Sequence, residues 1–175
     1  MASTKPRRRK IRYAVIGPGH IAQVAVLPAF AHARENSELA ALVSDDRVKL
    51  KALARKYRVE EVGEYAELEE LIARAGIDAV YIALPNHLHR EFTIRAARAG
   101  AHVLCEKPMA VTEEECVEMI DATAAAGVKL MIGYRLHFQS LHLHAIEAAG
   151  AGRLGKVRTF HGDLMITVKD HDNIR

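Results

Sequence analysis

The chain contains no tryptophan, only two cysteines, and few aromatic side chains, 5% of its 175 residues. Cys105 and Cys116 are too few to build a disulfide framework, so we expect a reducing, cytoplasmic environment. No apolar run approaches the roughly 20 residues that a membrane-spanning helix needs. No secretory signal pattern follows the N-terminus. These absences exclude a disulfide-stabilised secreted domain and predict no membrane partner.

A strong charge of one sign is also lacking, because the formal net charge is only +3. Much of the positive excess lies in Lys5 and the run 7–10, within residues 1–10, which we interpret as a disordered basic tail. The rest of the chain is near neutral, so we predict no nucleic-acid partner. A nucleic-acid or targeting role of the tail is the less favoured alternative.

Ten histidines raise the question of a metal site. His142 and His144 are two residues apart on a predicted helix, so they point in different directions and would not share an ion. His87 and His89 would converge only within a loop. We therefore predict no metal site.

The stretch IRYAVIGPGHIA, residues 11–22, organises what is present. Its apolar first half is typical of a buried parallel strand, and its second half is a G-x-G-x-x-A turn that opens a helix. Gly17 would permit the tight turn, Gly19 the close approach of a pyrophosphate, and Ala22 close packing of the helix on the strand. The sequence predicts a dinucleotide site here, with a purely structural turn as the alternative.

Strand and helix patterns then alternate along the chain. We predict strands at 39–43, 79–84, 102–105 and 128–132, with a doubtful short one at 62–65. Helices are predicted between them, and those before Gly76, Gly100 and Gly127 should stop at these glycines. This order favours an α/β fold with a Rossmann-type doubly wound parallel sheet.

Three details of the helices are also predicted. The first helix should run from His20 to about Arg34, with Pro28 kinking or shortening it and with Ile21, Val24 and Ala25 facing inward. Asn86 should cap the helix that reaches Ala99. Thr112 and Glu115 have the spacing of a capping box.

The rhythm changes after Gly133, where a helix is predicted near 141–149 and a long strand at 157–168. One strand without a partner cannot satisfy its backbone groups, so we interpret it as the start of a second, α+β domain. We therefore expect a nucleotide-binding domain at 11–135. Residues 136–175 would be a linker helix and the first strand of a truncated C-terminal domain.

Four stretches carry a resemblance: AVIGPGHIA at 14–22, LPNHLH at 84–89, CEKPMA at 105–110 and IGYRLHF at 132–138. Together they resemble the Gfo/Idh/MocA oxidoreductases, most closely the glucose–fructose oxidoreductases, from about Ile11 to Val168. The resemblance implies hydride transfer between NAD or NADP and a sugar or polyol hydroxyl carbon. It also implies a C-terminal domain that supplies most of the substrate pocket and an oligomer interface, so the full-length protein should be a homo-oligomer.

The resemblance further implies roles for individual residues. Glu106 matches the acid that contacts the ribose, Lys107 the catalytic lysine that also borders the cofactor, and Arg135 an arginine on the nicotinamide side. The remaining matches are Gly17, Pro18, Gly19, His20 and Ile21 at the pyrophosphate, and Leu84, Pro85, Asn86 and His89 in the loop under the nicotinamide half. An ammonium group at the substrate hydroxyl would stabilise the developing alkoxide.

Two local features of the E-K-P element are also predicted. The peptide bond before Pro108 is expected to be cis, because tight active-site turns retain cis proline. Cys105, next to Glu106 and Lys107, is interpreted as a buried thiol rather than a reactive one.

The choice of nucleotide depends on the end of the second strand. Asp45 or Asp46 would suit the ribose 2′-hydroxyl of NAD. Ser44, Lys49 and Tyr65 match the 2′-phosphate ligands of the glucose–fructose oxidoreductases, and Arg47 adds a cation. Asp45 departs from those relatives, which have glycine there, and its charge would repel a phosphate. Asp46 has the alternative role of a helix cap, with Arg47 and Lys49 solvated. We favour NADP, with NAD as the alternative.

The sequence thus predicts the nucleotide-binding part of an NADP-dependent sugar or polyol oxidoreductase. The family's other catalytic groups, an aspartate and a histidine, are expected beyond Arg175, so this chain alone should bind nucleotide with little or no turnover. The competing hypothesis is a non-catalytic dinucleotide sensor of the same fold, against which Lys107 argues.

Overall fold

A computed structural model of the chain describes residues 9–163. Most of the predicted basic tail, residues 1–8, lies outside the described residues, as does the end of the predicted long strand, 164–168. The chain divides into two compact units, residues 1–134 and 135–175. Each unit is described by itself.

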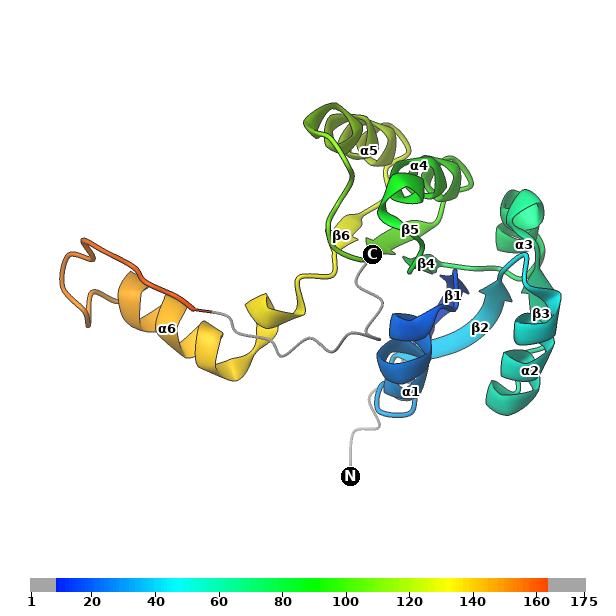
Figure 1. The fold of residues 1–175 in the computed structure, drawn as a ribbon, viewed down its shortest axis with the longest axis horizontal. Helices are drawn as coiled ribbons and strands as arrows, with labels where there is room; N and C mark the ends of the chain where they lie inside the picture. The colour runs from blue at the N-terminus through cyan, green and yellow to red at the C-terminus, as the bar shows by residue number, and fades with distance from the viewer. Residues whose placement is uncertain (1–8, 164–175) are drawn as a thin grey trace, which may run out of the picture. The chain divides into compact units, whose positions relative to one another are not determined.

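The first unit is built on a parallel six-stranded sheet (Figure 1). Its order is β3-β2-β1-β4-β5-β6, and every pair is parallel. The strands are β1 (Ile11–Ile16), β2 (Ser37–Val43), β3 (Glu61–Gly63), β4 (Ala79–Ile82), β5 (His102–Cys105) and β6 (Leu130–Ile132). The predicted doubly wound Rossmann sheet is therefore confirmed.

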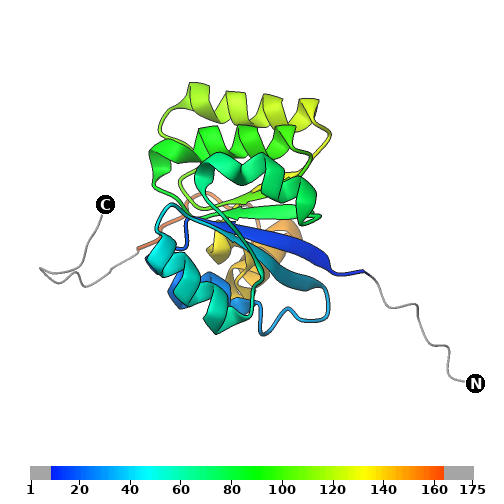
Figure 2. The same ribbon diagram turned by 90° about the vertical axis from the view of Figure 1, so that its right-hand side faces the viewer.

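Helices cover both faces of this sheet, as Figure 2 shows. On one face, Val15 and Leu42 pack with Leu27 and Leu50, which come from α1 (Leu27–Ala29) and α2 (Arg47–Tyr57). The other face carries the larger core, to which α3 (Leu68–Arg74), α4 (His89–Arg98) and α5 (Glu113–Ala125) contribute. Because both faces are buried, the strands read as continuous apolar runs rather than alternating ones.

The first helix differs from its prediction in length and in face. Residues 20–29 are helical, and the middle is a π-helix, η1 (Ala22–Val26), in which the Leu27 N–H donates to the Ala22 carbonyl. The helix ends at Ala29, not Arg34, so it is shortened, which is one of the two outcomes predicted from Pro28. Ala22 is fully buried, whereas Val24 is 57% exposed. The predicted inner face was therefore wrong, because the close approach of Ala22 to the sheet sets the rotation of the helix.

Other helix ends follow the sequence more closely. The helices α3, α4 and α5 each end two residues before Gly76, Gly100 and Gly127, as predicted. Asn86 does not cap α4. It opens a 3-10 turn, η3 (Asn86–Leu88), whose preceding residue is Pro85, and α4 follows it. This prediction was wrong because the backbone turn, rather than an Asn side chain, leads into the helix.

The predicted capping box of α5 is only half formed. Thr112 Oγ1 accepts a hydrogen bond from the Glu115 N–H at 3.3 Å. The Glu115 carboxylate, however, accepts from the Val111 N–H at 3.0 Å rather than from that of Thr112. The glutamate thus reaches one residue further back along the chain than the standard motif requires.

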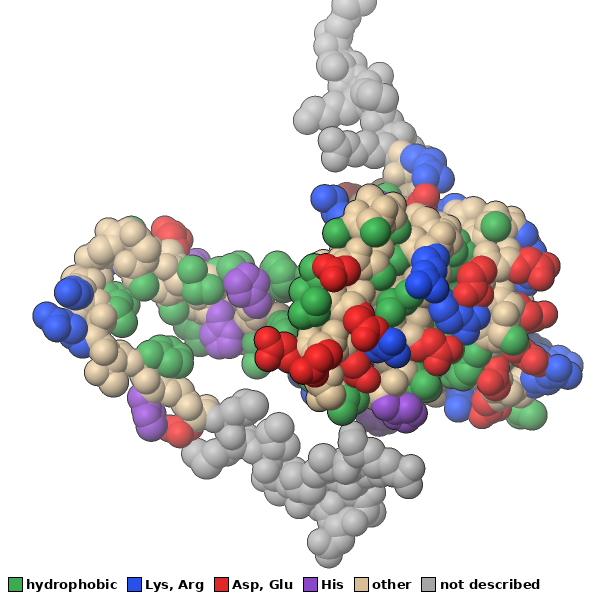
Figure 3. Space-filling model, turned by 90° about the horizontal axis from the view of Figure 1, so that it is seen from above, with side chains coloured by type: hydrophobic (Ala, Val, Ile, Leu, Met, Phe, Trp, Pro, Cys, Tyr) green, Lys and Arg blue, Asp and Glu red, His purple; other side chains and the backbone are tan. Residues whose placement is uncertain are grey.

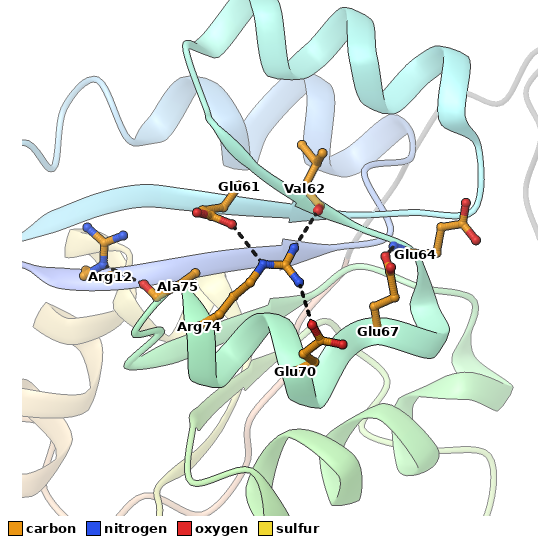
Figure 4. Close-up of polar contacts among 8 residues, drawn as sticks. All are labelled: Arg12, Glu61, Val62, Glu64, Glu67, Glu70, Arg74 and Ala75. Carbon is orange, nitrogen blue, oxygen red and sulfur yellow. Dashed lines mark hydrogen bonds and ion pairs between the residues drawn. The ribbon is translucent and has the colours of Figure 1, made fainter.

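A polar cluster ties α3 to the short edge strand β3 (Figure 4). Arg74 Nε donates to Glu61 at 3.2 Å, and a second guanidinium nitrogen donates to the Val62 carbonyl at 3.1 Å. Just beyond β3, the Glu64 N–H donates to the Glu67 carboxylate at 2.8 Å, which caps the 3-10 turn η2 (Tyr65–Glu67). These contacts fix the loop that carries Tyr65.

Charge is mixed over the helical face of the first unit that Figure 3 presents. Acidic and basic side chains alternate there, and several form pairs between neighbouring elements, such as Arg90 with Glu118 and Arg95 with Glu69. That face therefore carries no single-sign patch of the kind that binds a polyanion.

The second unit consists of a 3-10 turn, η4 (Arg135–Phe138), and α6 (Ser140–Gly150), followed by residues without regular structure up to 163. The strand predicted from Val157 is absent over residues 157–163. A single strand has no neighbour to pair with here, so its backbone groups gain nothing from an extended ladder. Across residues 9–163, no helix combines the length and apolarity that crossing a bilayer demands.

Candidate nucleotide-binding site

Most of the predicted site residues of the first unit lie in turns that follow the strands at one edge of the sheet. Ile16 of β1 pairs with Val43 of β2 and with Ile82 of β4, and Ile82 pairs with Cys105 of β5. The turns that follow these strands therefore start side by side at the carboxyl edge. The strand order reverses between β1 and β4, and such a switch point is where open α/β sheets bind their ligands.

Gly17 occupies a position that no other residue would fill without strain. Its φ is +74°, and a Cβ there would lie 2.5 Å from Leu84 Cδ2 and 3.0 Å from the Ala83 carbonyl oxygen. Its N–H donates to the Val43 carbonyl at 3.0 Å. Gly17 thus permits the tight turn, as predicted, and it also packs the turn directly on the loop that follows β4.

Gly19 is different, because the protein itself leaves space beside it. A Cβ there would meet only the Gly17 carbonyl, at 3.8 Å, which is an ordinary contact. The turn is held by the Gly19 N–H, which donates to Gly17 at 2.6 Å, and by Gln23 Nε2, which donates to the Pro18 carbonyl at 2.9 Å. His20 and Ile21 are exposed beside it. The turn therefore has the open, side-chain-free surface that a pyrophosphate needs.

The end of β2 gathers the residues predicted near the adenosine ribose. Ser44 is 4% exposed, and its hydroxyl oxygen accepts from the Asp46 N–H at 3.2 Å. The Asp45 carboxylate accepts from the Tyr65 N–H at 2.8 Å. Burial is the main cause that raises the pKa of Tyr65, and a hydrogen bond with Ser44 and the charge of Lys49 oppose it. Ser44, Asp45, Lys49 and Tyr65 therefore lie together.

The cations of this cluster are paired with acids. Asp46 caps α2: its carboxylate accepts from the Lys49 N–H at 2.9 Å and forms an ion pair with Lys49 Nζ at 3.0 Å. These hydrogen bonds lower the pKa of Asp46. Arg47 pairs with Glu64, which raises the pKa of Arg47. The capping role of Asp46 is confirmed, but Arg47 and Lys49 are ion-paired rather than merely solvated.

The E-K-P element follows β5 directly. One Glu106 carboxylate oxygen accepts from the Tyr81 hydroxyl at 2.5 Å, and the other accepts from the Lys107 N–H at 3.2 Å. Lys107 is exposed, and the Lys107–Pro108 peptide bond is cis, which confirms that prediction. Sequence patterns did not single out Tyr81, although a tyrosine within the aliphatic strand AVYIAL is a signal of a polar hydroxyl at the end of an apolar ring.

The loop after β4 contains both exposed and buried members of the predicted site. Pro85 and Asn86 are exposed, and Leu84 packs under Gly17. His89 is 1% exposed, and its two ring nitrogens lie 2.9 Å from the carbonyl oxygens of Leu84 and Pro108. Any contribution of His89 to nucleotide binding is therefore indirect.

Two further predicted residues have distinct positions. Arg135 is exposed in η4 and belongs to the second compact unit. Cys105 is fully buried at the end of β5, and burial raises the pKa of its thiol to about 12. The buried interpretation of Cys105 is confirmed.

Comparison with known proteins places this geometry among oxidoreductases. Residues 11–134 match a family described as an oxidoreductase family with an NAD-binding Rossmann fold. Among solved structures, the chain is similar to an aldose–aldose oxidoreductase from Caulobacter crescentus in complex with glycerol, with a TM-score of 0.82 and 47% identity. That match covers 86% of this chain and 45% of the other.

Two curated relatives show the range of named activities. The chain is 35% identical to a 1,5-anhydro-D-fructose reductase of Ensifer adhaerens, over 86% of this chain and 45% of the relative. It is also 35% identical to a D-xylose 1-dehydrogenase (NADP(+)) of Haloferax volcanii, over 93% of this chain and 49% of the relative. The chain thus spans about half the length of the relatives it matches.

Proposed function

This chain belongs to the Gfo/Idh/MocA family of oxidoreductases, and from that premise we propose that it binds NADP(H) as the nucleotide-binding part of a sugar or polyol oxidoreductase. In the intact polypeptide, hydride would pass to or from a hydroxyl carbon of the substrate. The relatives whose names refer to sugars are longer than this chain, so the substrate and the turnover are part of the proposal.

The observation that carries the proposal is the contrast between the two glycines of the turn. Gly17 is required by the fold, whereas the space beside Gly19 is required by nothing within the described part of the chain. A bare backbone at the start of a helix, at the switch point of the sheet, suits a pyrophosphate. Through Leu84, the same turn is packed against the loop that would lie under the nicotinamide.

The preference for NADP is supported by the cluster at the end of β2. Ser44 and Tyr65 offer hydroxyl groups and Lys49 an ammonium group, and these three lie together. Asp45 opposes a 2′-phosphate by its charge, but its carboxylate already accepts a hydrogen bond from the Tyr65 backbone. Rearrangement of the Lys49 side chain from Asp46 would give the phosphate a cation.

Within this chain, Lys107 is the residue proposed to act on the substrate and Glu106 the residue proposed to contact the ribose. The nicotinamide cofactor supplies the hydride acceptor or donor when bound. The Lys107 ammonium would stabilise the negative charge that develops on the substrate hydroxyl oxygen as its proton passes to water. Glu106, oriented by the Tyr81 hydroxyl, would accept hydrogen bonds from the ribose.

Fluorescence titration of the chain with NADPH and NADH tests the nucleotide proposal. We expect NADPH to bind more tightly, and Asp45→Gly to increase that preference several-fold by removing a negative charge near the 2′-phosphate. Glu60→Gly, at an exposed position after α2, is the matched control and should leave the preference unchanged. Tenfold tighter binding of NADH than of NADPH would show the preference for NADP to be wrong.

Turnover of the intact polypeptide tests the enzymatic role of Lys107. We expect Lys107→Ala to lower kcat by about 10²- to 10³-fold, as removal of a group that stabilises transition-state charge does, while NADPH binding is retained. Unchanged turnover would reject the catalytic assignment. An intact polypeptide that binds nucleotide but turns over no sugar or polyol would support a dinucleotide sensor instead.

A further inference from the structure

The geometry points to His89 as a positioning residue: we propose that its imidazole links the loop after β4 (residues 83–88) to the loop after β5 (residues 106–110). The link would hold Lys107 at a fixed distance from the nicotinamide-side loop. This inference deepens the proposed function and rests on it for the role of Lys107. The link itself concerns the protein without nucleotide and can be measured there.

The imidazole is enclosed by one carbonyl group from each loop. Nδ1 lies 2.9 Å from the Pro108 carbonyl oxygen and Nε2 lies 2.9 Å from the Leu84 carbonyl oxygen. The side chain is 1% exposed, so it offers no free edge to a ligand. Pro108 directly follows Lys107, and Leu84 packs under Gly17. His89 therefore lies between the two parts of the proposed site.

Both partners of the imidazole are carbonyl oxygens, which accept hydrogen bonds and cannot donate them. A neutral imidazole donates from one nitrogen and an imidazolium from both. At 2.9 Å, each contact has hydrogen-bond length. A neutral ring therefore donates to one loop and meets the carbonyl of the other only by contact, whereas a doubly protonated ring donates to both carbonyls and ties both loops.

Apolar packing also joins the two loops, because Leu84 and Leu88 of the first and Met109 and Ala110 of the second belong to one core cluster. Within the first loop, the Leu88 N–H donates to the Pro85 carbonyl at 2.9 Å. Within the second, the Lys107 N–H donates to its neighbour Glu106. These bonds shape each loop, and the Glu106 N–H, which donates to the Ile82 carbonyl at 2.9 Å, fixes where the two loops start. His89, at the start of α4 near the buried Phe92 and Thr93, adds to them a polar side chain that contacts the backbone of both loops.

Backbone ¹⁵N relaxation of the chain without nucleotide tests the link. In His89→Phe, which keeps a ring but removes both nitrogens, we expect the order parameters of both loops to fall together, from about 0.85 toward 0.6. His89→Gln retains an amide donor and should give a smaller fall, which also provides a variant if His89→Phe does not fold. His87→Phe, at an exposed position of the same loop, is the matched control and should change neither loop.

The proposal would be overturned if residues 106–110 keep their wild-type order parameters in the folded His89 variants. An equal loss of order throughout the helices would also overturn it, because that result shows a general structural role.

A ligand comparison then connects the link with the site. We expect His89→Phe to weaken the binding of NADPH at least tenfold. The binding of adenosine 2′,5′-bisphosphate, which lacks the nicotinamide half, should weaken less than twofold. Equal weakening of the two ligands would contradict a role on the nicotinamide side. If the wild-type chain binds neither ligand, the proposed function fails, whereas the relaxation measurements still decide whether His89 links the loops.

Discussion

At the scale of the residue, burial determines the chemistry of the two cysteines. Cys105 ends β5 inside the core, whereas Cys116 on α5 is partly exposed. Burial disfavours the thiolate, and it raises the pKa of Cys105 to about 12. The basic neighbour Lys107 does not offset this, so Cys105 is a packing residue.

This difference predicts the labelling of thiols. With a disulfide reagent at pH 8, we expect one thiol of the folded chain to react quickly and two thiols to react after unfolding in guanidinium chloride. Cys116→Ser should abolish the fast reaction. Rapid labelling of Cys105 in the folded Cys116→Ser variant would contradict its burial.

The pKa of Cys105 also sets a direction for stability at high pH. Above pH 9 the unfolded chain loses the thiol proton while the folded chain retains it. Stability due to this group is therefore fully present below pH 9 and declines between pH 9 and about 12. The decline should be smaller in Cys105→Ala than in the wild type, as the pH dependence of thermal unfolding would show.

At the scale of the element, Arg95 joins α4 to the segment that carries Tyr65. Its guanidinium donates to both Glu69 carboxylate oxygens, at 2.6 and 2.7 Å, and to the Tyr65 carbonyl at 2.8 Å. It also lies 5.0 Å from the centre of the Phe92 ring. The Glu69 hydrogen bond raises the pKa of Arg95, and Arg95 lowers the pKa of Glu69. This bidentate pair is stronger than an ordinary surface pair.

We therefore expect Arg95→Ala to reduce the free energy of unfolding by about 1–2 kcal/mol, because a bidentate pair and a backbone contact are lost. Arg90→Ala, which removes the more exposed pair with Glu118, should cost less than about 0.5 kcal/mol. Urea unfolding at pH 7 measures both. The Arg95 effect should shrink as the pH falls through the lowered pKa of Glu69, and equal effects of the two substitutions would contradict the account.

The sequence predicted which helices and strands form more accurately than the residues at which they begin and end. Buried parallel strands such as AVYIAL are continuous apolar runs, so their positions could be predicted from the local sequence. Pro28 indicated that the first helix is shortened, but the helix end at Ala29 is set by the backbone turns that follow it, and the start of α4 by the 3-10 turn at Asn86. Side-chain patterns do not locate such turns. The strand predicted from Val157 required a partner strand, which a pattern within one segment cannot guarantee.

For the site, the local motifs could be predicted from the sequence, but the contacts between distant segments could not. The glycine turn and the cis bond before Pro108 followed from local motifs. The burial of His89 between two carbonyls and the contact of Tyr81 with Glu106 depend on how β4 and β5 lie together. Such contacts between segments distant in sequence have no local signature.

At the scale of the whole molecule, the proposed site belongs to the first compact unit. Residues 17–21, 44–49, 65, 84–89 and 106–107 all lie within residues 1–134, and Arg135 alone falls in the second unit. The family match also ends at residue 134. Nucleotide binding is therefore proposed as a property of this unit, and substrate binding as a property of the intact polypeptide.

The most direct test of this account compares NADPH binding and stability in Gly17→Ala and Gly19→Ala. Gly17→Ala should lose about 2 kcal/mol or more of stability, because its Cβ would meet Leu84 at 2.5 Å in a left-handed backbone. Gly19→Ala should keep its stability within about 0.5 kcal/mol yet bind NADPH at least tenfold more weakly. A Gly19→Ala variant that is stable and binds NADPH as tightly as the wild type would contradict the claim that this turn holds the pyrophosphate.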